Sequence, residues 1–258
     1  MPAHWSAQQY VVFEDERTRP VRDLVNAIPS TAIGSVVDLG CGPGNSTEVV
    51  VARFPDAAVT GLDSSPEMVE AARKRLPGIR FEKAEIENWD EPGPFDVILA
   101  NAVFHWVANH AALFPRLVAK LAPGGSLAVQ MPDNLDEPAH QLIRETARSG
   151  PWSDRLVDAV KARTMVESPN WYYDLLRTHC QRVEIWRTTY YHALTGGVDA
   201  VVEWFKGSGL RPFLTRLSEI EQPAFLDRYR AALATAYTPL PNGVVLLPFP
   251  RLFIVATR

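Results

Sequence analysis

The sequence predicts an α/β fold built on a doubly wound, mostly parallel sheet. Short apolar runs alternate with helical segments from about residue 35 to residue 131, and this pattern is typical of a parallel sheet covered on both faces. With 258 residues and 47% hydrophobic content, the chain can bury one sizeable core and carry a smaller appended region.

The first half of the chain supplies the parallel strands. The strand candidates are Ser35–Leu39, Ala58–Asp63, Arg80–Glu82, Phe95–Asn101 and Ser126–Met131. The helices expected between them are Ser46–Arg53, Pro66–Arg75 and Leu113–Leu121. Ser65 should cap the second helix, because Pro66 is suited to the first helical position. The Pro and Gly residues in 122–125 should end the third helix and turn the chain into a strand.

Beyond Asp133 the alternation stops and the pattern becomes mostly helical. Helix-like stretches cover Glu137–Ser149, Ser153–Val166 and Tyr172–His179. Two further strand candidates follow, Val183–His192 and Leu252–Thr257, and a long, mostly helical insertion separates them. This half therefore adds helices and two late strands to the parallel sheet.

A glycine-rich turn joins the first strand to the first helix. Its glycines, which can adopt positive φ or let a ligand approach the backbone, are Gly40, Gly42 and Gly44. Asn45, Ser46 and Thr47 offer cap-type oxygens where the helix should begin. Asp63 ends the second strand, where nucleotide-binding folds carry an acid that binds ribose hydroxyls. The turn and the acid together predict a nucleotide-like ligand.

The spacing argues against a dinucleotide. A dinucleotide fingerprint requires a glycine at position 45, but this sequence has Asn45 there. In addition, the acidic side chain of Asp38 would repel a diphosphate. The same acid suits a ligand that carries an ammonium or sulfonium cation. The stretch from Asp38 to Gly44 resembles motif I of the class I S-adenosyl-L-methionine (SAM)-dependent methyltransferases.

This resemblance implies a Rossmann-like fold and SAM as the cofactor. Asp38 and the loop amides would meet the methionine portion, Asp63 the ribose and Glu85 the adenine amino group. The residues expected to bind the cofactor are Asp38, Gly40, Gly42, Gly44, Asp63, Ser64, Met68, Glu85, Ile86 and Asn101. The alternatives are that Asp38 only caps the turn, that Glu85 is a solvated loop charge, and that Trp89 and Met68 are core residues.

Segments spread over the whole chain also resemble the trans-aconitate methyltransferase family. They are Trp5–Tyr10 with Phe13, Arg17–Pro20, Gln130–Asn134, Ile185–His192, Gly209–Pro212 and Phe249–Ala256. The resemblance implies methyl transfer from SAM to one carboxylate of trans-aconitate, a small-molecule polycarboxylate.

The same resemblance completes the expected architecture. The two late strands would form an antiparallel pair that closes a seven-stranded sheet. We expect a single methyltransferase domain over residues 1–258, with a core of about 30–135, 180–192 and 250–258. Cap elements would come from about 1–25, 136–179 and 193–249.

A carboxylate acceptor sets simple requirements. It is already ionised at pH 7, so the enzyme must chiefly align it. Arginine forks would hold the carboxylates that do not react, and weaker donors would face the reacting oxygen. The expected catalytic residues are Tyr10, His105, Arg187, Tyr190 and Arg211. Further candidates are Arg17, Arg19, Trp106, His192 and Arg251, although each arginine alternatively pairs with a surface acid. The remaining histidines, expected to be surface or packing residues, are His4, His110, His140 and His179.

Composition disfavours other classes of partner. The net charge is −4 and there is no long basic run, which argues against nucleic acid. Two cysteines, with no Cys/His cluster at zinc spacing, predict neither a disulfide framework nor a metal site. With no signal peptide or membrane-length apolar run, we expect a cytoplasmic enzyme with no obligate protein partner. The alternatives are another small acceptor, a non-catalytic nucleotide-binding protein and, least favoured, an NAD oxidoreductase.

Overall fold

The computed structural model describes residues 14–29, 32–161 and 166–258. These residues form two compact units. The sheet unit contains the described residues of Trp5–Pro132, Val166–Thr188 and Leu252–Arg258. The helical unit contains those of Asp133–Met165 and Thr189–Arg251. None of the helices in these ranges has the length and apolar character needed to span a membrane.

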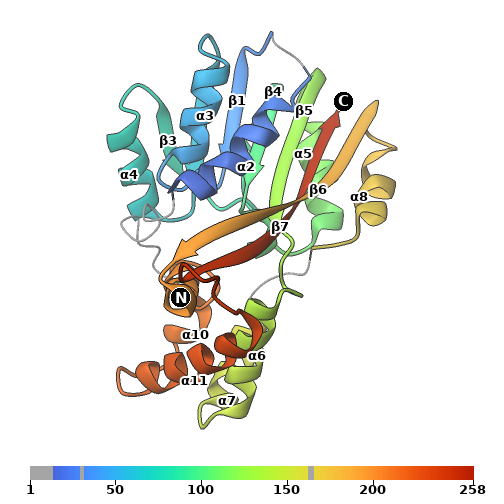
Figure 1. Ribbon diagram of the computed structural model, residues 1–258. Helices are drawn as coiled ribbons and strands as arrows, with labels where there is room; N and C mark the ends of the chain where they lie inside the picture. Colours follow the sequence, from blue (N-terminus) through green and yellow to red (C-terminus); the bar gives the residue numbers. More distant parts are fainter. Residues whose placement is uncertain (1–13, 30–31, 162–165) are drawn as a thin grey trace. The chain divides into compact units, whose positions relative to one another are not determined.

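The sheet has seven strands in the order β3-β2-β1-β4-β5-β7-β6. Their bounds are Ser35–Leu39 (β1), Ala58–Asp63 (β2), Arg80–Lys83 (β3), Phe95–Asn101 (β4), Leu121–Pro132 (β5), Arg182–Thr195 (β6) and Val244–Thr257 (β7). β1 to β5 pair in parallel. β7 runs antiparallel to β5 (Figure 1), because Gly125 accepts a hydrogen bond from the Arg258 amide while Ser126 bonds to Thr257. The predicted mixed α/β sheet is therefore confirmed.

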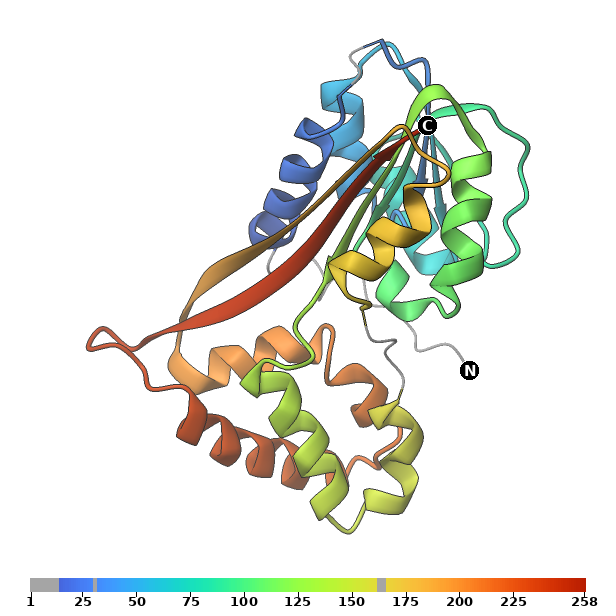
Figure 2. The same ribbon diagram turned by 90° about the vertical axis from the view of Figure 1, so that its right-hand side faces the viewer.

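Helices cover both faces of this sheet. The helices of the sheet unit are α2 (Glu14–Asn26), α3 (Asn45–Arg53), α4 (Pro66–Arg75), the 3-10 turn η1 (Phe104–Trp106), α5 (His110–Ala119) and α8 (Pro169–Leu176). Figure 2 shows α2 and α3 on one face and α5 and α8 on the other. α2 packs on α3 and β5, whereas α5 packs on α8 and β5. α4, α5 and α8 each bury apolar residues, among them Met68, Leu113 and Leu176.

Two expected cap segments lie in the sheet unit instead. α2 buries Val21 and Leu24, and α8 inserts Tyr172 and Leu176 into the main core cluster. The segments 14–25 and 166–179, which were expected to belong to a cap, thus supply apolar surface to the sheet unit. Other differences concern element ends. β7 begins at Val244 rather than Leu252, and α5 begins at His110 because Asn109 caps it.

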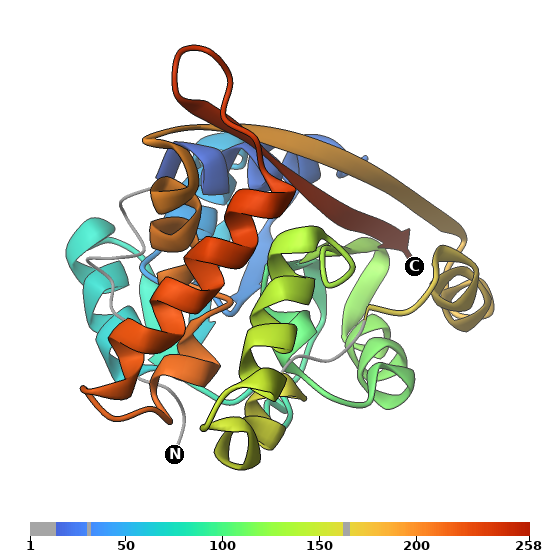
Figure 3. The same cartoon turned by 60° about the horizontal axis from the view of Figure 1, so that its bottom comes forward.

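The helical unit is built from the insertions. Its helices are α6 (Pro138–Ser149), α7 (Ser153–Val160), α9 (Gly197–Lys206), α10 (Arg211–Leu214) and α11 (Glu221–Ala236). α11 packs along α6, as Figure 3 shows, and also contacts α9. The Tyr229 hydroxyl donates to the Ala139 carbonyl (3.2 Å), and the Tyr237 hydroxyl accepts from the Ala139 amide (3.1 Å). These bonds fix the start of α6 against the chain around α11.

Candidate functional site

The glycine-rich loop after β1 is tightly held on one side and open on the other. The amides of Gly40 and Cys41 both donate to the Leu62 carbonyl, at 2.7 and 2.9 Å. Gly40 has φ +71°, and a Cβ there would meet Val103 Cγ2 at 2.5 Å. Gly42 has φ +55°, but a Cβ there would have no neighbour within 4 Å. The predicted positive φ values are confirmed, and the loop leaves open backbone at Gly42.

Asp38 is buried beneath this loop and is held by the first turn of α3. Its Oδ2 accepts from the hydroxyls of Ser46 (2.6 Å) and Thr47 (2.7 Å). The expectation that these residues supply a side-chain cap was wrong. The N-cap is Gly44, with no side-chain cap bond, because α3 already begins at Asn45 and Ser46 and Thr47 lie inside its first turn. Burial raises the pKa of Asp38 to about 6, although the two hydroxyl bonds act in the opposite direction.

Two buried acceptor atoms lie near the carboxyl ends of the neighbouring strands β1 and β4. Asp38 Oδ1 and Asn101 Oδ1 accept no hydrogen bond from the described part of the chain. Asp38 is paired with Leu99, so Asn101 lies just beyond it at the carboxyl edge of the sheet. Burying such oxygens without a donor is costly. A bound cation with several N–H groups, such as an ammonium, would satisfy them.

Asp63 connects the loop to the next helix. Its Oδ2 accepts from the Gly42 amide (2.9 Å) and its Oδ1 from the Ser65 amide (2.8 Å). Burial raises the pKa of this carboxyl, and the negative charge of Glu85 acts in the same direction. Each carboxylate oxygen retains capacity for a further hydrogen bond. Asp63 can therefore hold the loop and also accept from hydroxyls of a ligand.

The remaining expected cofactor residues follow β2 and β3. Ser65 Oγ accepts from the Met68 amide, which confirms the predicted cap, and Met68 is buried. Ser64 and Glu85 are exposed, whereas Ile86 is buried. Trp89 packs on Phe95 with ring centroids 5.5 Å apart, which confirms the interpretation of Trp89 as a core residue. All ten expected cofactor residues thus lie at, or directly after, the carboxyl ends of four adjoining strands, where open α/β sheets bind ligands.

His105 lies in η1, shortly after β4. It is buried, and its ring contacts that of Trp106 with centroids 4.9 Å apart. A network that the sequence did not reveal adjoins it. His110 Nδ1 lies 2.7 Å from the Tyr172 hydroxyl, and Nε2 lies 3.0 Å from the Phe104 carbonyl. His110 was expected to be a surface or packing residue, and it packs. No local signal indicated Tyr172, because the two residues are 62 positions apart.

The other expected acceptor residues are divided between the units. Arg187 is exposed on the part of β6 that belongs to the sheet unit. In the helical unit, Tyr190 is buried, and Arg211 begins α10. Arg251 is also buried, with its guanidinium 4.8 Å from the Phe249 ring centroid. Tyr10 lies outside the described residues.

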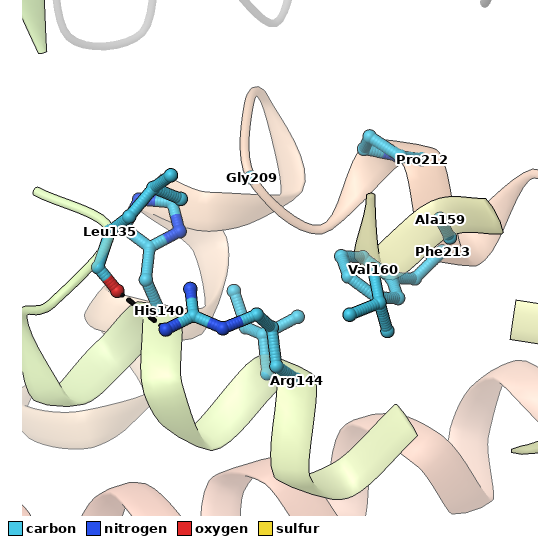
Figure 4. Close-up of a pocket in the computed structure, with 9 residues that line it drawn as sticks. Leu135, His140, Arg144, Ala159, Val160, Gly209, Pro212 and Phe213 are labelled. Atoms are coloured by element: carbon cyan, nitrogen blue, oxygen red, sulfur yellow. Dashed lines mark hydrogen bonds between the residues drawn. The ribbon is translucent and has the colours of Figure 1, made fainter. Parts of the chain in front are cut away.

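A separate pocket belongs wholly to the helical unit (Figure 4). It is mostly apolar, with His140 and Arg144 as its polar side chains. Arg144 Nη2 donates to the Leu135 carbonyl at 2.8 Å. Pro212 also lines it, but none of the site residues predicted from the sequence does.

The comparisons agree with this geometry. Residues 36–125 match a family described as "Methyltransferase domain". The chain is 54% identical to a trans-aconitate 2-methyltransferase from Methylobacterium nodulans over 99% of each chain. It is 50% identical to one from Rhizobium meliloti over 98% of each. The crystal structure of the YcgJ protein from Bacillus subtilis shares the fold, with a TM-score of 0.59, 15% identity and coverage of 93% of this chain and 98% of that one.

Proposed function

The chain belongs to the trans-aconitate 2-methyltransferase family, and from this premise we propose that it transfers a methyl group from SAM to one carboxylate of trans-aconitate. The products are the monomethyl ester and S-adenosylhomocysteine. The proposal rests on the sequence identity of 54% to a trans-aconitate 2-methyltransferase over nearly the whole length of both chains. This similarity extends beyond residues 36–125, which match the common methyltransferase domain.

The carboxyl edge of the sheet fits SAM. Asp38 Oδ1 and Asn101 Oδ1 would accept from its ammonium group, since both are buried acceptors that receive no hydrogen bond from the residues that the structure describes. Asp63 would accept from the ribose hydroxyls while holding Gly42 and Ser65. The open backbone at Gly42 leaves room for the ligand to approach. When bound, SAM supplies a methyl group on a positively charged sulfur.

The acceptor needs placement more than activation. Its carboxylates are ionised at neutral pH, so no residue has to remove a proton. We propose that Arg187 and Arg211 hold carboxylates that do not react, and that Tyr10, His105 and Tyr190 face the reacting one. Guanidinium on the reacting oxygen would stabilise the nucleophile, so weaker donors suit that position.

A panel of acceptors tests the proposal. Purified protein would be incubated with SAM and, separately, trans-aconitate, cis-aconitate, citrate, a monocarboxylic acid and a quinol. We expect turnover with trans-aconitate, with a mass gain of one methyl group and loss of one carboxylate charge. Turnover of a monoanionic or neutral acceptor alone would remove the substrate assignment. Tight S-adenosylhomocysteine binding with no methylated product would favour a non-catalytic binding protein.

We also propose a reducing compartment, such as the cytoplasm. Cys41 and Cys180 are both free thiols. Cys41 is buried within a small apolar cluster with Val69 and Phe81, and its burial raises the pKa of the thiol far above the ordinary value. Such a thiol is a packing group rather than a reactive one.

A further inference from the structure

A chain of hydrogen bonds crosses the core of the sheet unit behind η1. The Glu167 amide lies 3.4 Å from the Tyr172 hydroxyl, which lies 2.7 Å from His110 Nδ1. His110 Nε2 lies 3.0 Å from the Phe104 carbonyl oxygen. Tyr172 is fully buried and His110 is 5% exposed. The bond between Tyr172 and His110 therefore lies in a dry environment, where a hydrogen bond is stronger and a broken one is costly, whereas Glu167 at the end of the network is exposed.

The partners determine where the protons lie. The Phe104 carbonyl can only accept, so His110 Nε2 must carry a proton. In the neutral ring Nδ1 is then an acceptor, and the Tyr172 hydroxyl donates a hydrogen bond to it. That hydroxyl oxygen in turn accepts from the Glu167 amide. The order is Glu167 N–H to Tyr172, Tyr172 O–H to His110, and His110 N–H to Phe104.

The last acceptor in this network of hydrogen bonds, the Phe104 carbonyl, directly precedes His105. The Phe104 carbonyl belongs to the peptide plane that begins His105. It also accepts from the Val107 amide (2.9 Å), so the plane is held from two directions. η1 has only three residues and follows Ala102, whose φ of +53° is unfavourable for a residue with a Cβ. A short turn after a strained residue needs such outside support to keep one conformation.

We propose that His110 and Tyr172 are positioning residues that orient the η1 turn, and with it His105, for methyl transfer. This inference rests on the proposed function, in which His105 faces the acceptor. The role proposed for His110 and Tyr172 requires no contact of these residues with cofactor or acceptor. They act through the Phe104–His105 peptide.

Variants of Tyr172 and His110 test the inference. Tyr172→Phe removes one hydroxyl, and His110→Leu removes the donor to Phe104. His110→Gln keeps an amide donor at the position of Nε2. We expect Tyr172→Phe and His110→Leu to lower kcat roughly tenfold, as small misplacements of reacting groups do, with the KM for SAM unchanged. His110→Gln should retain most of the rate. Tyr173→Phe, on the next residue of α8 and half exposed, is the matched control.

The measurements separate positioning from simple stability. Rates would be normalised to the number of S-adenosylhomocysteine sites, which counts folded protein. Long-range ¹H–¹⁵N spectra would report the imidazole tautomers, with the His105 signals assigned from their loss in His105→Gln. Altered His105 signals in Tyr172→Phe support the inference.

Two results would overturn it: full normalised kcat in Tyr172→Phe and His110→Leu, or unchanged His105 signals. If the wild type methylates no acid at all, the proposed function fails, but the His105 spectra still show whether the network positions the turn.

Discussion

The carboxylate of Asp63 accepts a hydrogen bond from the amide of Gly42, 21 residues earlier in the chain, at 2.9 Å. Its other oxygen accepts from the Ser65 amide. One side chain thus fixes both the glycine-rich loop and the start of α4. A ligand that binds between them meets a surface that is already formed, and this lowers the entropy cost of binding.

Asp63→Ala should therefore weaken cofactor binding by tens-fold or more. The variant loses the acceptors for the ribose and also releases the loop, and hydrogen bonds to charged groups are worth about 1.5–3 kcal/mol each. Calorimetric titration with S-adenosylhomocysteine measures the effect. Asp56→Ala, an exposed acid in the turn before β2, is the control and should bind normally. Equal affinity of both variants would contradict the role of Asp63.

Affinity for S-adenosylhomocysteine should rise with pH through about 6. Burial raises the pKa of Asp38 to about 6, so below that pH the carboxyl is protonated and cannot pair with an ammonium group. Binding would fall roughly tenfold per pH unit below the pKa, with proton uptake to Asp38 in the free protein. Asp38→Asn should bind weakly and lose most of this dependence. Protonation of Asp63, whose pKa is also raised by burial, should account for the pH dependence of binding that remains in this variant.

The free protein should show the opposite trend in stability. The unfolded Asp38 has an ordinary pKa of 3.8, whereas the folded one is near 6, so the folded state binds more protons between these values. Stability should fall as pH rises from about 4 to 6 and then level off, as far as Asp38 is concerned. Urea unfolding of wild type and Asp38→Asn at each pH isolates this contribution. A difference between them that is constant with pH would contradict the assignment.

The loop glycines should respond differently to alanine. Gly40→Ala places a Cβ 2.5 Å from Val103 Cγ2 in a left-handed conformation, so we expect severe destabilisation. Gly42→Ala meets no atom and should cost only the conformational strain, about 1–2 kcal/mol. Gly42→Ala should nevertheless impair binding, because the new methyl group occupies the open side of the loop. Gly78→Ala, which has equal space and no positive φ, is the control for thermal unfolding.

Arg187→Met should raise the KM for trans-aconitate far more than the KM for SAM. A guanidinium that holds a non-reacting carboxylate contributes to acceptor binding and not to cofactor binding. Arg182→Met is the matched control, because Arg182 is exposed on the same strand and paired with Glu184 at 2.6 Å. Steady-state kinetics with each substrate varied would decide the matter. Equal effects of Arg187→Met on both KM values would argue against a substrate clamp.

Several features followed from local sequence. The parallel strands were predictable because buried strands appear as short apolar runs, and Ser65 with Pro66 specified the start of α4 through one cap bond. The glycines of the loop predicted positive φ values, because a residue without a Cβ adopts them easily. Trp89 was expected to be core and is core.

Other features depended on partners far away in the sequence. Ser46 and Thr47 looked like caps, and only the position of Asp38 beneath α3 turned their hydroxyls toward a carboxylate. The segment of α8 was expected to belong to a cap over the sheet, but its Tyr172 contacts His110 and Phe114 in the sheet unit. Such pairings are decided by packing, and no local pattern encodes them.

By itself the sequence determined the alternation of strands and helices, the side-chain-poor loop with its two aspartates, and a family resemblance over the whole length. The first two are properties of short segments, set by periodicity and backbone freedom. The tertiary structure alone decided which acids are buried, which oxygens lack a donor, and how His110 reaches the peptide of His105. Burial and hydrogen-bond partnership arise only when distant segments pack against one another, so their chemical consequences could not be derived from the chain alone.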